Sequence, residues 1–199
     1  MVSDPTVRLL LLTCLLPLAA AVPRAAETEN LAERNLRRIV ERQKDVLAEA
    51  AKEGESLDEA ALKRRLQEIA HDYEVLLRDN PRYAAAYAAY GYLLSKVDMR
   101  KEASAMLLKA NELDPDIALV KNQLGNLLAE DGKPVQAASY FLAAIKLEPK
   151  EPLYHYQLGT LLVEGREEFL KTGQWTRASL DAAVLEAFRQ ASELAPDRF

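Results

Sequence analysis

Cysteine is almost absent from this sequence of 199 residues, which contains only Cys14. A single cysteine cannot supply an internal disulfide or a site of several thiolates. Cys14 follows Thr13 and is itself followed by more apolar sequence, an arrangement that disfavours a lipid-modified cysteine. Cleavage after Ala21 would leave a chain with no cysteine. We therefore expect the remaining chain to fold by helix packing alone.

Glycine and proline are few, and long runs of basic residues are missing. The sequence has seven glycines and nine prolines, and Ala, Leu, Glu, Lys and Arg dominate it. These five residue types lose little free energy on entering a helix. The formal net charge is −5, whereas nucleic-acid binding needs a clustered cationic surface. With 49% apolar and 29% charged residues, the composition predicts a folded, mainly helical protein that does not bind nucleic acid.

Motifs for catalysis, metals and cofactors are missing as well. The two histidines, His71 and His155, have no cysteine or histidine partner at ligand spacing. No phosphate-binding loop or nucleophile elbow is present. Acidic residues alternate with basic ones along helix faces, as in the pair Glu59 and Lys63, which is typical of solvated ion pairs. The sequence predicts no enzyme, no catalytic residue, no metal site and no cofactor.

The amino-terminal segment resembles a secretory signal peptide. Arg8 precedes an apolar run at 9–16, and three small residues end at Ala21. The run is too short for a comfortable membrane span. We expect a signal peptide at 1–21, cleaved after Ala21, and hence an exported chain that is periplasmic or secreted. Because Asp4 offsets Arg8, an uncleaved anchor and a buried helix stay open as alternatives.

Glycine and proline recur with one common period along the chain. Two sets share a sequence separation of 34: Gly91, Gly125 and Gly159, and Pro81, Pro115 and Pro149. Laying 84–117 over 118–151 also aligns four apolar pairs: Leu94 with Leu128, Ala103 with Ala137, Leu107 with Phe141, and Ala110 with Ala144. Several residue types sharing one period indicate a repeat architecture.

The repeated positions resemble the tetratricopeptide repeat, a pair of antiparallel helices. The resemblance is carried by Tyr87, Tyr90, Gly91, Leu94, Ala103, Leu107, Ala110 and Pro115, and again by Leu124, Gly125, Leu128, Ala137, Phe141, Ala144 and Pro149. It implies an all-α fold, a right-handed superhelical solenoid of antiparallel helix pairs. The repeats are expected at 84–117, 118–151 and 152–199, preceded by a long helical hairpin at 27–83 that is either a degenerate repeat or an amino-terminal cap.

The physical roles of these positions follow from residue size. A glycine inside a helix costs about 1 kcal/mol relative to alanine, so we expect a neighbouring helix to approach each repeated glycine closely. Leu107 and Phe141 supply bulk between the helices. Pro115 and Pro149 follow segments where the second helix of a unit must end. The segment 131–134 is expected to form the turn inside the second repeat.

The third repeat carries an insertion. The sequence separation of Gly159 and Pro196 is 37, against 24 for the corresponding pairs of the other repeats, which places an insertion of length 13 within 165–179. The insertion contains Phe169 and Trp175, the only tryptophan. One interpretation is a longer first helix followed by a loop whose two aromatic residues fold back on the solenoid. The other is a loop in which Phe169 and Trp175 contact a partner.

Upstream of the repeats, two helical patterns form the expected hairpin. Apolar periodicity marks a helix over 27–53, and a second helix follows as far as Pro81. Ser56 and Glu59 are expected to form a capping box, and Ser179 to begin the last helix in the same way. Helix 27–53 is expected to cap the array, with pairing to a second copy as the alternative.

The resemblance also implies which side chains face a partner. Tetratricopeptide repeats turn part of each first helix toward a concave groove, and the matching positions are Tyr92, Ser95, Lys96, Asn122, Asn126, Glu130, Tyr156, Thr160 and Glu164. Asn122 and Asn126, one helical turn apart, can hydrogen-bond an extended peptide backbone. The alternative is that all nine are solvated surface residues. Ala88 and Gln157 stand where a carboxylate clamp would need basic residues, and Glu130 with Glu164 favours a neutral or basic ligand.

We expect from these features an exported scaffold that binds a protein or peptide partner in cell-envelope assembly. The alternative is a recruiting or regulatory segment of a larger enzyme or complex whose catalytic part is absent from this chain. Self-association through helix 27–53 or through an uncapped carboxy-terminal face is a further alternative, because solenoids usually end in a polar helix.

Overall fold

The computed structural model describes residues 30–53 and 58–197, and its helices belong to the unit Leu31–Phe199. In chain order they are α1 (Leu31–Glu53), α2 (Glu59–Asp79), α3 (Ala84–Lys96), α4 (Arg100–Leu113), α5 (Ala118–Glu130), α6 (Pro134–Leu147), α7 (Pro152–Glu164), α8 (Arg166–Lys171) and α9 (Arg177–Leu194). No strand occurs in these described ranges. The predicted signal peptide lies outside them.

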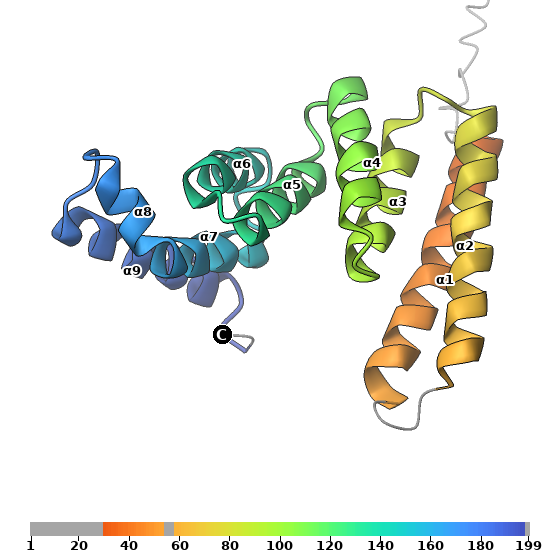
Figure 1. The fold of residues 1–199 in the computed structure, drawn as a ribbon, viewed down its shortest axis with the longest axis horizontal. Coiled ribbons are helices and arrows are strands. Elements are labelled where there is room, and N and C mark those ends of the chain that lie inside the picture. The colour runs from red at the N-terminus through yellow and green to blue at the C-terminus, as the bar shows by residue number, and fades with distance from the viewer. Residues whose placement is uncertain (1–29, 54–57, 198–199) are drawn as a thin grey trace, which may run out of the picture. The chain divides into compact units, whose positions relative to one another are not determined.

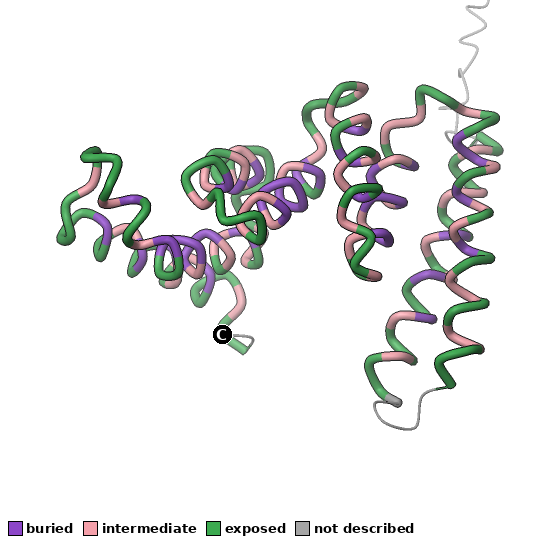
Figure 2. The backbone as a smooth tube through the Cα atoms, viewed as in Figure 1, coloured by how far each residue is buried: buried purple, intermediate pink, exposed green. Residues whose placement is uncertain are grey.

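The helices pair in sequence order (Figure 1). Contacts join α1 with α2, α3 with α4, α5 with α6, and α7 with α9, and each pair also touches the next through α2–α3, α4–α5 and α6–α7. Buried residues follow the sides of the helices that face one another (Figure 2). Because each pair completes its core only against a neighbour, the unit is a solenoid of helix hairpins. The predicted all-α repeat fold is confirmed.

The expected close approaches at the repeated glycines are present. A Cβ atom at Gly91 would lie 2.7 Å from Cγ of Leu107. The corresponding contact in the second repeat would join Gly125 to Cδ1 of Phe141 at 2.8 Å. These distances are shorter than carbon atoms tolerate, so glycine is required where the two helices of a repeat cross.

The turns between paired helices use the left-handed backbone conformation. Gly132, between α5 and α6, has φ +69°, and Asp98, one repeat earlier, has φ 59°. Aspartate is one of the few side chains that tolerate this region. Pro134 then occupies the first turn of α6, where its missing N–H costs nothing.

Both predicted helix starts differ from the observed ones. At α2 the N-cap is Asp58, whose Oδ1 accepts a hydrogen bond from the backbone N of Ala61 at 3.0 Å, while Ser56 lies outside the described residues. At α9 the N-cap is Thr176, whose Oγ1 accepts from the backbone N of Ser179 at 3.1 Å. Ser179 is the reciprocal partner, since its Oγ accepts from the backbone N of Thr176 at 3.0 Å. The predicted caps were therefore wrong, because Asp58 and Thr176 place an acceptor three residues before a free N–H.

The amino-terminal hairpin is tied together by a buried polar contact. The Tyr73 hydroxyl donates to Oε1 of Gln43 at 2.7 Å, and both side chains are buried. The Tyr73 ring also stacks on Tyr90 of α3, with ring centroids 5.2 Å apart. An ion pair of Arg42 with Asp72 adds to the contact between α1 and α2. The hairpin thus covers the first tetratricopeptide-like pair, as a cap would.

The insertion in the third repeat forms a separate short helix and a folded-back loop. Helix α7 ends at Glu164, no later than its counterparts, so the predicted longer first helix is wrong. Helix α8 instead buries Phe169, which is 2% exposed, in the core between α7 and α9. Trp175 packs edge-on against Phe169, with ring centroids 6.2 Å apart. The interpretation that these two aromatic residues fold back is confirmed.

Helix α9 carries a polar residue at a position where α6, its counterpart in the second repeat, carries an apolar one. Ile145 of α6 packs on neighbouring residues, whereas the corresponding position in α9 is the exposed Ser192. Arg189 donates to the Glu186 carboxylate at 2.6 Å, and this contact lowers the pKa of Glu186 to about 2. Leu185 and Leu194 are exceptions, being 71% and 37% exposed.

Among the described helices, none combines the length and the apolar character needed to cross a bilayer.

Candidate peptide-binding site

A pocket between α5 and α7 brings together five of the nine predicted groove residues. The cavity has a volume of about 260 Å³, and the predicted residues that line it are Asn126, Glu130, Tyr156, Thr160 and Glu164. The pocket is completed by Ala129, Phe141, Gln157 and Leu161. Phe141 and Leu161 are buried core residues, and the other lining residues are polar apart from Ala129. The five predicted residues come from the first helices of the second and third repeats.

A hydrogen bond between amide side chains spans the pocket wall. Nε2 of Gln157 on α7 donates to Oδ1 of Asn126 on α5 at 3.1 Å. The other amide atom of Gln157, Oε1, is buried and has no hydrogen-bond partner among the described residues. An unpaired buried acceptor of this kind is costly to the fold.

Two carboxylates lie on the rim of the pocket. Oε2 of Glu130 is 3.4 Å from Nη2 of Arg100, a guanidinium that lies closer to Asp131, at 2.8 Å. Within the described residues the carboxylate of Glu164 has no ion-pair partner. Arg166, further along the chain, pairs with Asp181 instead at 2.6 Å. The rim therefore carries an excess of negative charge.

Tyr156, the aromatic side chain exposed at the pocket, packs against a core residue. Tyr156 is 40% exposed, and its ring meets Phe188 of α9 edge-on, with centroids 5.6 Å apart. Thr160, one turn later, donates its hydroxyl to the backbone oxygen of Tyr156 at 3.1 Å. Phe188 also fills the space beside Gly159, where a Cβ would lie 2.9 Å from its Cε1. Core packing thus fixes the ring that faces the pocket.

Asn122 does not lie on the accessible surface, contrary to the prediction. Its side chain is 0% exposed, and both amide atoms lack a hydrogen-bond partner among the described residues. The corresponding position is the small, buried Ala88 in the first repeat and the exposed Tyr156 in the third. The repeat period predicts that the three side chains point in the same direction from their helices. It does not show how closely the neighbouring repeat packs against each of them.

The three predicted residues of the first repeat lie apart from the pocket, at the end of α3. Nζ of Lys96 lies 5.3 Å from the centroid of the Tyr92 ring. The Ser95 hydroxyl donates to the backbone oxygen of Tyr92 at 2.7 Å and lies 3.4 Å from Oε1 of Gln123 on α5. These contacts connect α3 to α5 on the surface formed by the first helices.

Two further predicted residues can be assigned from their burial. Phe169 is a core residue, so its predicted role as a partner contact is wrong: the short helix α8 turns it inward. Trp175 is half-buried against it. Gln157, which the sequence analysis considered only as a possible clamp position, is an additional pocket residue. The signal for it was present, since Gln123 and Gln157 are one repeat period apart and place the same amide at the same helix position.

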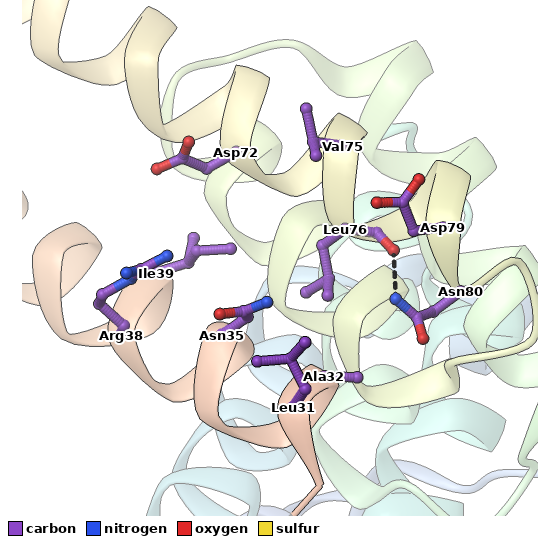
Figure 3. Close-up of a pocket in the computed structure, with 10 residues that line it drawn as sticks. All are labelled: Leu31, Ala32, Asn35, Arg38, Ile39, Asp72, Val75, Leu76, Asp79 and Asn80. Carbon is purple, nitrogen blue, oxygen red and sulfur yellow. Dashed lines mark hydrogen bonds between the residues drawn. The ribbon is translucent and has the colours of Figure 1, made fainter.

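Other cavities of the unit are lined by paired charges or mainly by apolar side chains. A cavity of about 310 Å³ between α1 and α2 is shown in Figure 3, where Asn80 donates to the backbone oxygen of Leu76 at 2.9 Å. Its acidic residues Asp72 and Asp79 pair with arginines. A third cavity, of about 370 Å³ between α2 and α3, is lined mainly by apolar side chains such as Leu66.

The candidate metal ligands do not gather. Within the described residues no group of three or more histidine, cysteine, aspartate or glutamate side chains is placed to hold a metal ion. His71 is exposed on α2, and Nε2 of His155 lies 2.9 Å from the backbone oxygen of Pro149.

Comparison with known proteins shows which family model and which solved structures this fold matches. Residues 84–117 match the family model of the tetratricopeptide repeat. Solved structures with a similar fold include MamA, with a TM-score of 0.55, 15% identity, and coverage of 85% of this chain and 96% of MamA. The predicted resemblance is confirmed: residues 84–117 match the tetratricopeptide-repeat model, and the described helices have the fold of tetratricopeptide-repeat solenoids.

Two further structures are similar to parts of this chain. YrrB, a TPR protein with an unusual peptide-binding site, has a TM-score of 0.52 and 23% identity over 69% of this chain and 64% of its own. The O-GlcNAc transferase of Thermobaculum terrenum has a TM-score of 0.59 and 17% identity over 81% of this chain. The chain spans 27% of that transferase. No curated protein is significantly similar in sequence.

Proposed function

We propose that this protein is a non-enzymatic binding module that holds an extended segment of a partner protein across the first helices of its repeats. The observation that carries the proposal is the pocket between α5 and α7, where five predicted groove residues meet. Amide side chains at its wall can pair with a peptide backbone, which presents both donors and acceptors. Tyr156 adds stiff contact area that loses little conformational entropy on binding.

The first helices of successive repeats are linked by side-chain contacts along one surface. The side-chain contact between Ser95 and Gln123 links α3 to α5, and the bond between Gln157 and Asn126 links α5 to α7. A peptide lying along this surface would cross all three repeats. Similarity to YrrB, whose structure includes a peptide-binding site, is consistent with this use of the fold.

The proposal is tested by selecting random twelve-residue peptides on the immobilised full chain and measuring the affinity of the enriched peptides. A variant carrying Tyr92→Ala, Asn126→Ala and Thr160→Ala should weaken binding by at least about tenfold. A matched control carries three alanine substitutions at exposed polar residues of α6 and α9, namely Gln136→Ala, Ser139→Ala and Ser192→Ala. Circular dichroism checks that both variants are folded. Failure to enrich peptides, or equal affinities for the two variants, would reject the proposal.

We propose further that the chain is exported to the periplasm or secreted and acts in cell-envelope assembly. The support is the apolar segment at 9–16 followed by small residues ending at Ala21. Mass spectrometry of the protein purified from its native cells tests this directly. A mature chain beginning at Val22 is expected, whereas a chain that keeps residues 1–21 would contradict cleavage.

A second candidate function is that of a recruiting segment for a larger enzyme or complex. The similarity to a part of the Thermobaculum terrenum transferase favours it, because there the repeat fold accompanies a much longer chain. Co-purification of this protein with a catalytic subunit in fixed stoichiometry would support the recruiting function. Recovery of the chain alone, with peptide binding intact, would support the independent module.

A further inference from the structure

The pocket between α5 and α7 is lined by two carboxylates, Glu130 and Glu164, which are hydrogen-bond acceptors only. Of the donors nearby, Nε2 of Gln157 bonds Asn126 and the Thr160 hydroxyl bonds the backbone of α7. A ligand that brings its own donors would therefore be matched by the two carboxylates.

The charge of the pocket selects among donor-rich ligands. Glu164 has no ion-pair partner within the described residues, and Arg100 is shared between Glu130 and the nearer Asp131. In the part of the chain that the structure describes, no lysine or arginine lines the pocket. A positive group entering it would gain charge-assisted hydrogen bonds, whereas a carboxylate would meet repulsion.

The size of the pocket and its lining residues narrow the choice of ligand further. A volume of about 260 Å³ lies below the range usual for sites of whole drug-sized molecules and suits one side chain. Phe141 at the floor and Tyr156 at the wall offer aromatic surfaces to the apolar stem and to the face of a planar cation. Arginine has five donors in a planar fork, against three donors on the compact ammonium of lysine.

We propose that this pocket binds a basic side chain of the partner segment, arginine in preference to lysine. Glu164 and Glu130 neutralise the charge, and Tyr156 packs along the stem. The inference rests on the proposed peptide-binding function and adds to it the residue that is recognised. It makes Glu164 a specificity-determining residue, since it is the rim carboxylate without an ion-pair partner among the described residues.

The first test uses small probes, so that it does not depend on finding the partner. Nα-acetyl-arginine amide and Nα-acetyl-citrulline amide have nearly the same shape, but only the first is charged. Each is titrated into the isotope-labelled full chain and followed by amide NMR. Saturable shifts at Asn126, Gln157 and Glu164 are expected with the arginine probe, and at least about tenfold weaker binding with the citrulline probe. Equal binding of the two probes, or shifts confined to other residues, would overturn the inference.

Variants identify the carboxylate that is responsible. Glu164→Gln should weaken binding of the arginine probe by at least about fivefold, and Glu130→Gln by less, because Arg100 already offsets its charge. Glu41→Gln on α1 is the matched control: it removes the same charge from an exposed position far along the sequence and should change nothing. Loss of binding in the control, or none in Glu164→Gln, would count against a specific site.

The two proposals can fail separately. If the selected twelve-residue peptides depend on Asn126 and Thr160 but carry no enriched basic residue, peptide binding stands and the basic-side-chain pocket is rejected. If arginine or lysine is enriched at one position and this enrichment disappears in selections on Glu164→Gln, both stand. If no peptide is enriched, the peptide-binding function fails, and the result with the two small probes decides the pocket independently.

Discussion

A Cβ atom added to Gly125 would lie 2.8 Å from two ring carbons of Phe141, Cδ1 and Cε1. The corresponding partner of Gly91 is Leu107, at the same separation in sequence. In the third repeat the partner of Gly159 is Phe188, and here the separation is longer by the length of the insertion. The inserted segment therefore falls between the two members of this contact, and α8 accommodates it without disturbing the helix crossing.

Gly125→Ala is expected to destabilise the protein. Phe141 is 2% exposed and packs in the core, so overpacking should cost about 1–3 kcal/mol. The better helix propensity of alanine returns about 1 kcal/mol of this at most. The free energy of unfolding is measured by urea titration. A double-mutant cycle with Phe141→Ala provides the control: if the two changes are simply additive, steric conflict with Phe141 is not the cause.

The glycines show what the sequence could predict. Their common period revealed the repeats, and a helical glycine has a cost that only a close neighbour explains, so the crossings followed from local physics. The proline positions likewise marked helix ends, since α4 and α6 end at Leu113 and Leu147, each shortly before a proline. These features are local and occur in more than one repeat, so each repeat supports the assignment of the others.

Burial between repeats could not be predicted in the same way. Asn122 and Tyr156 occupy one repeat position, yet Asn122 is fully buried and Tyr156 is 40% exposed. The difference depends on the bulk that neighbouring helices bring to each site, and this varies along the chain. The place of Gln157 in the pocket was not predicted for the same reason, because its role depends on its distance from Asn126 on another helix.

Asn122→Leu is expected to stabilise the protein. The buried amide has no partner among the described residues, so replacing it with an apolar side chain of similar size should raise the free energy of unfolding by about 1–2 kcal/mol. Asn126→Leu, one turn along the same helix, is the matched comparison. It removes the acceptor of Gln157 and should lower stability instead. Loss of stability in Asn122→Leu would indicate that the amide is satisfied in solution.

Phe169→Ala is expected to loosen the third repeat. Truncating a buried phenylalanine usually costs about 3–5 kcal/mol, and this one packs between α7 and α9. Trp175, the only tryptophan, loses its edge-on contact, so its fluorescence should shift to longer wavelength. Leu185→Ala removes a side chain that is 71% exposed and is the control. Unchanged fluorescence in Phe169→Ala would contradict the folded-back loop.

Alkaline pH is expected to weaken the fold through buried tyrosines. Burial, and then the nearby Glu74 carboxylate, raises the pKa of Tyr90 to about 12, and burial raises the pKa of Tyr73 still further. In the unfolded chain these hydroxyls titrate near pH 10. A pKa that is raised by folding gives stability that is complete below about pH 10 and is lost as the pH rises toward 12.

The absorbance of tyrosinate measures this difference. Tyr90 and Tyr73 should ionise well above pH 10, the value for an unfolded tyrosine, together with the loss of helical circular dichroism. Glu74→Gln removes the carboxylate that accepts a hydrogen bond from the Tyr90 hydroxyl at 3.2 Å. This change should lower the pKa of Tyr90 and leave the ionisation of Tyr73 unchanged. Because Tyr73 and Tyr90 stack at the contact between α2 and α3, their late ionisation reports that this contact is intact. A single titration near pH 10 by a chain that is still helical would show that the hairpin does not cover the first repeat in solution.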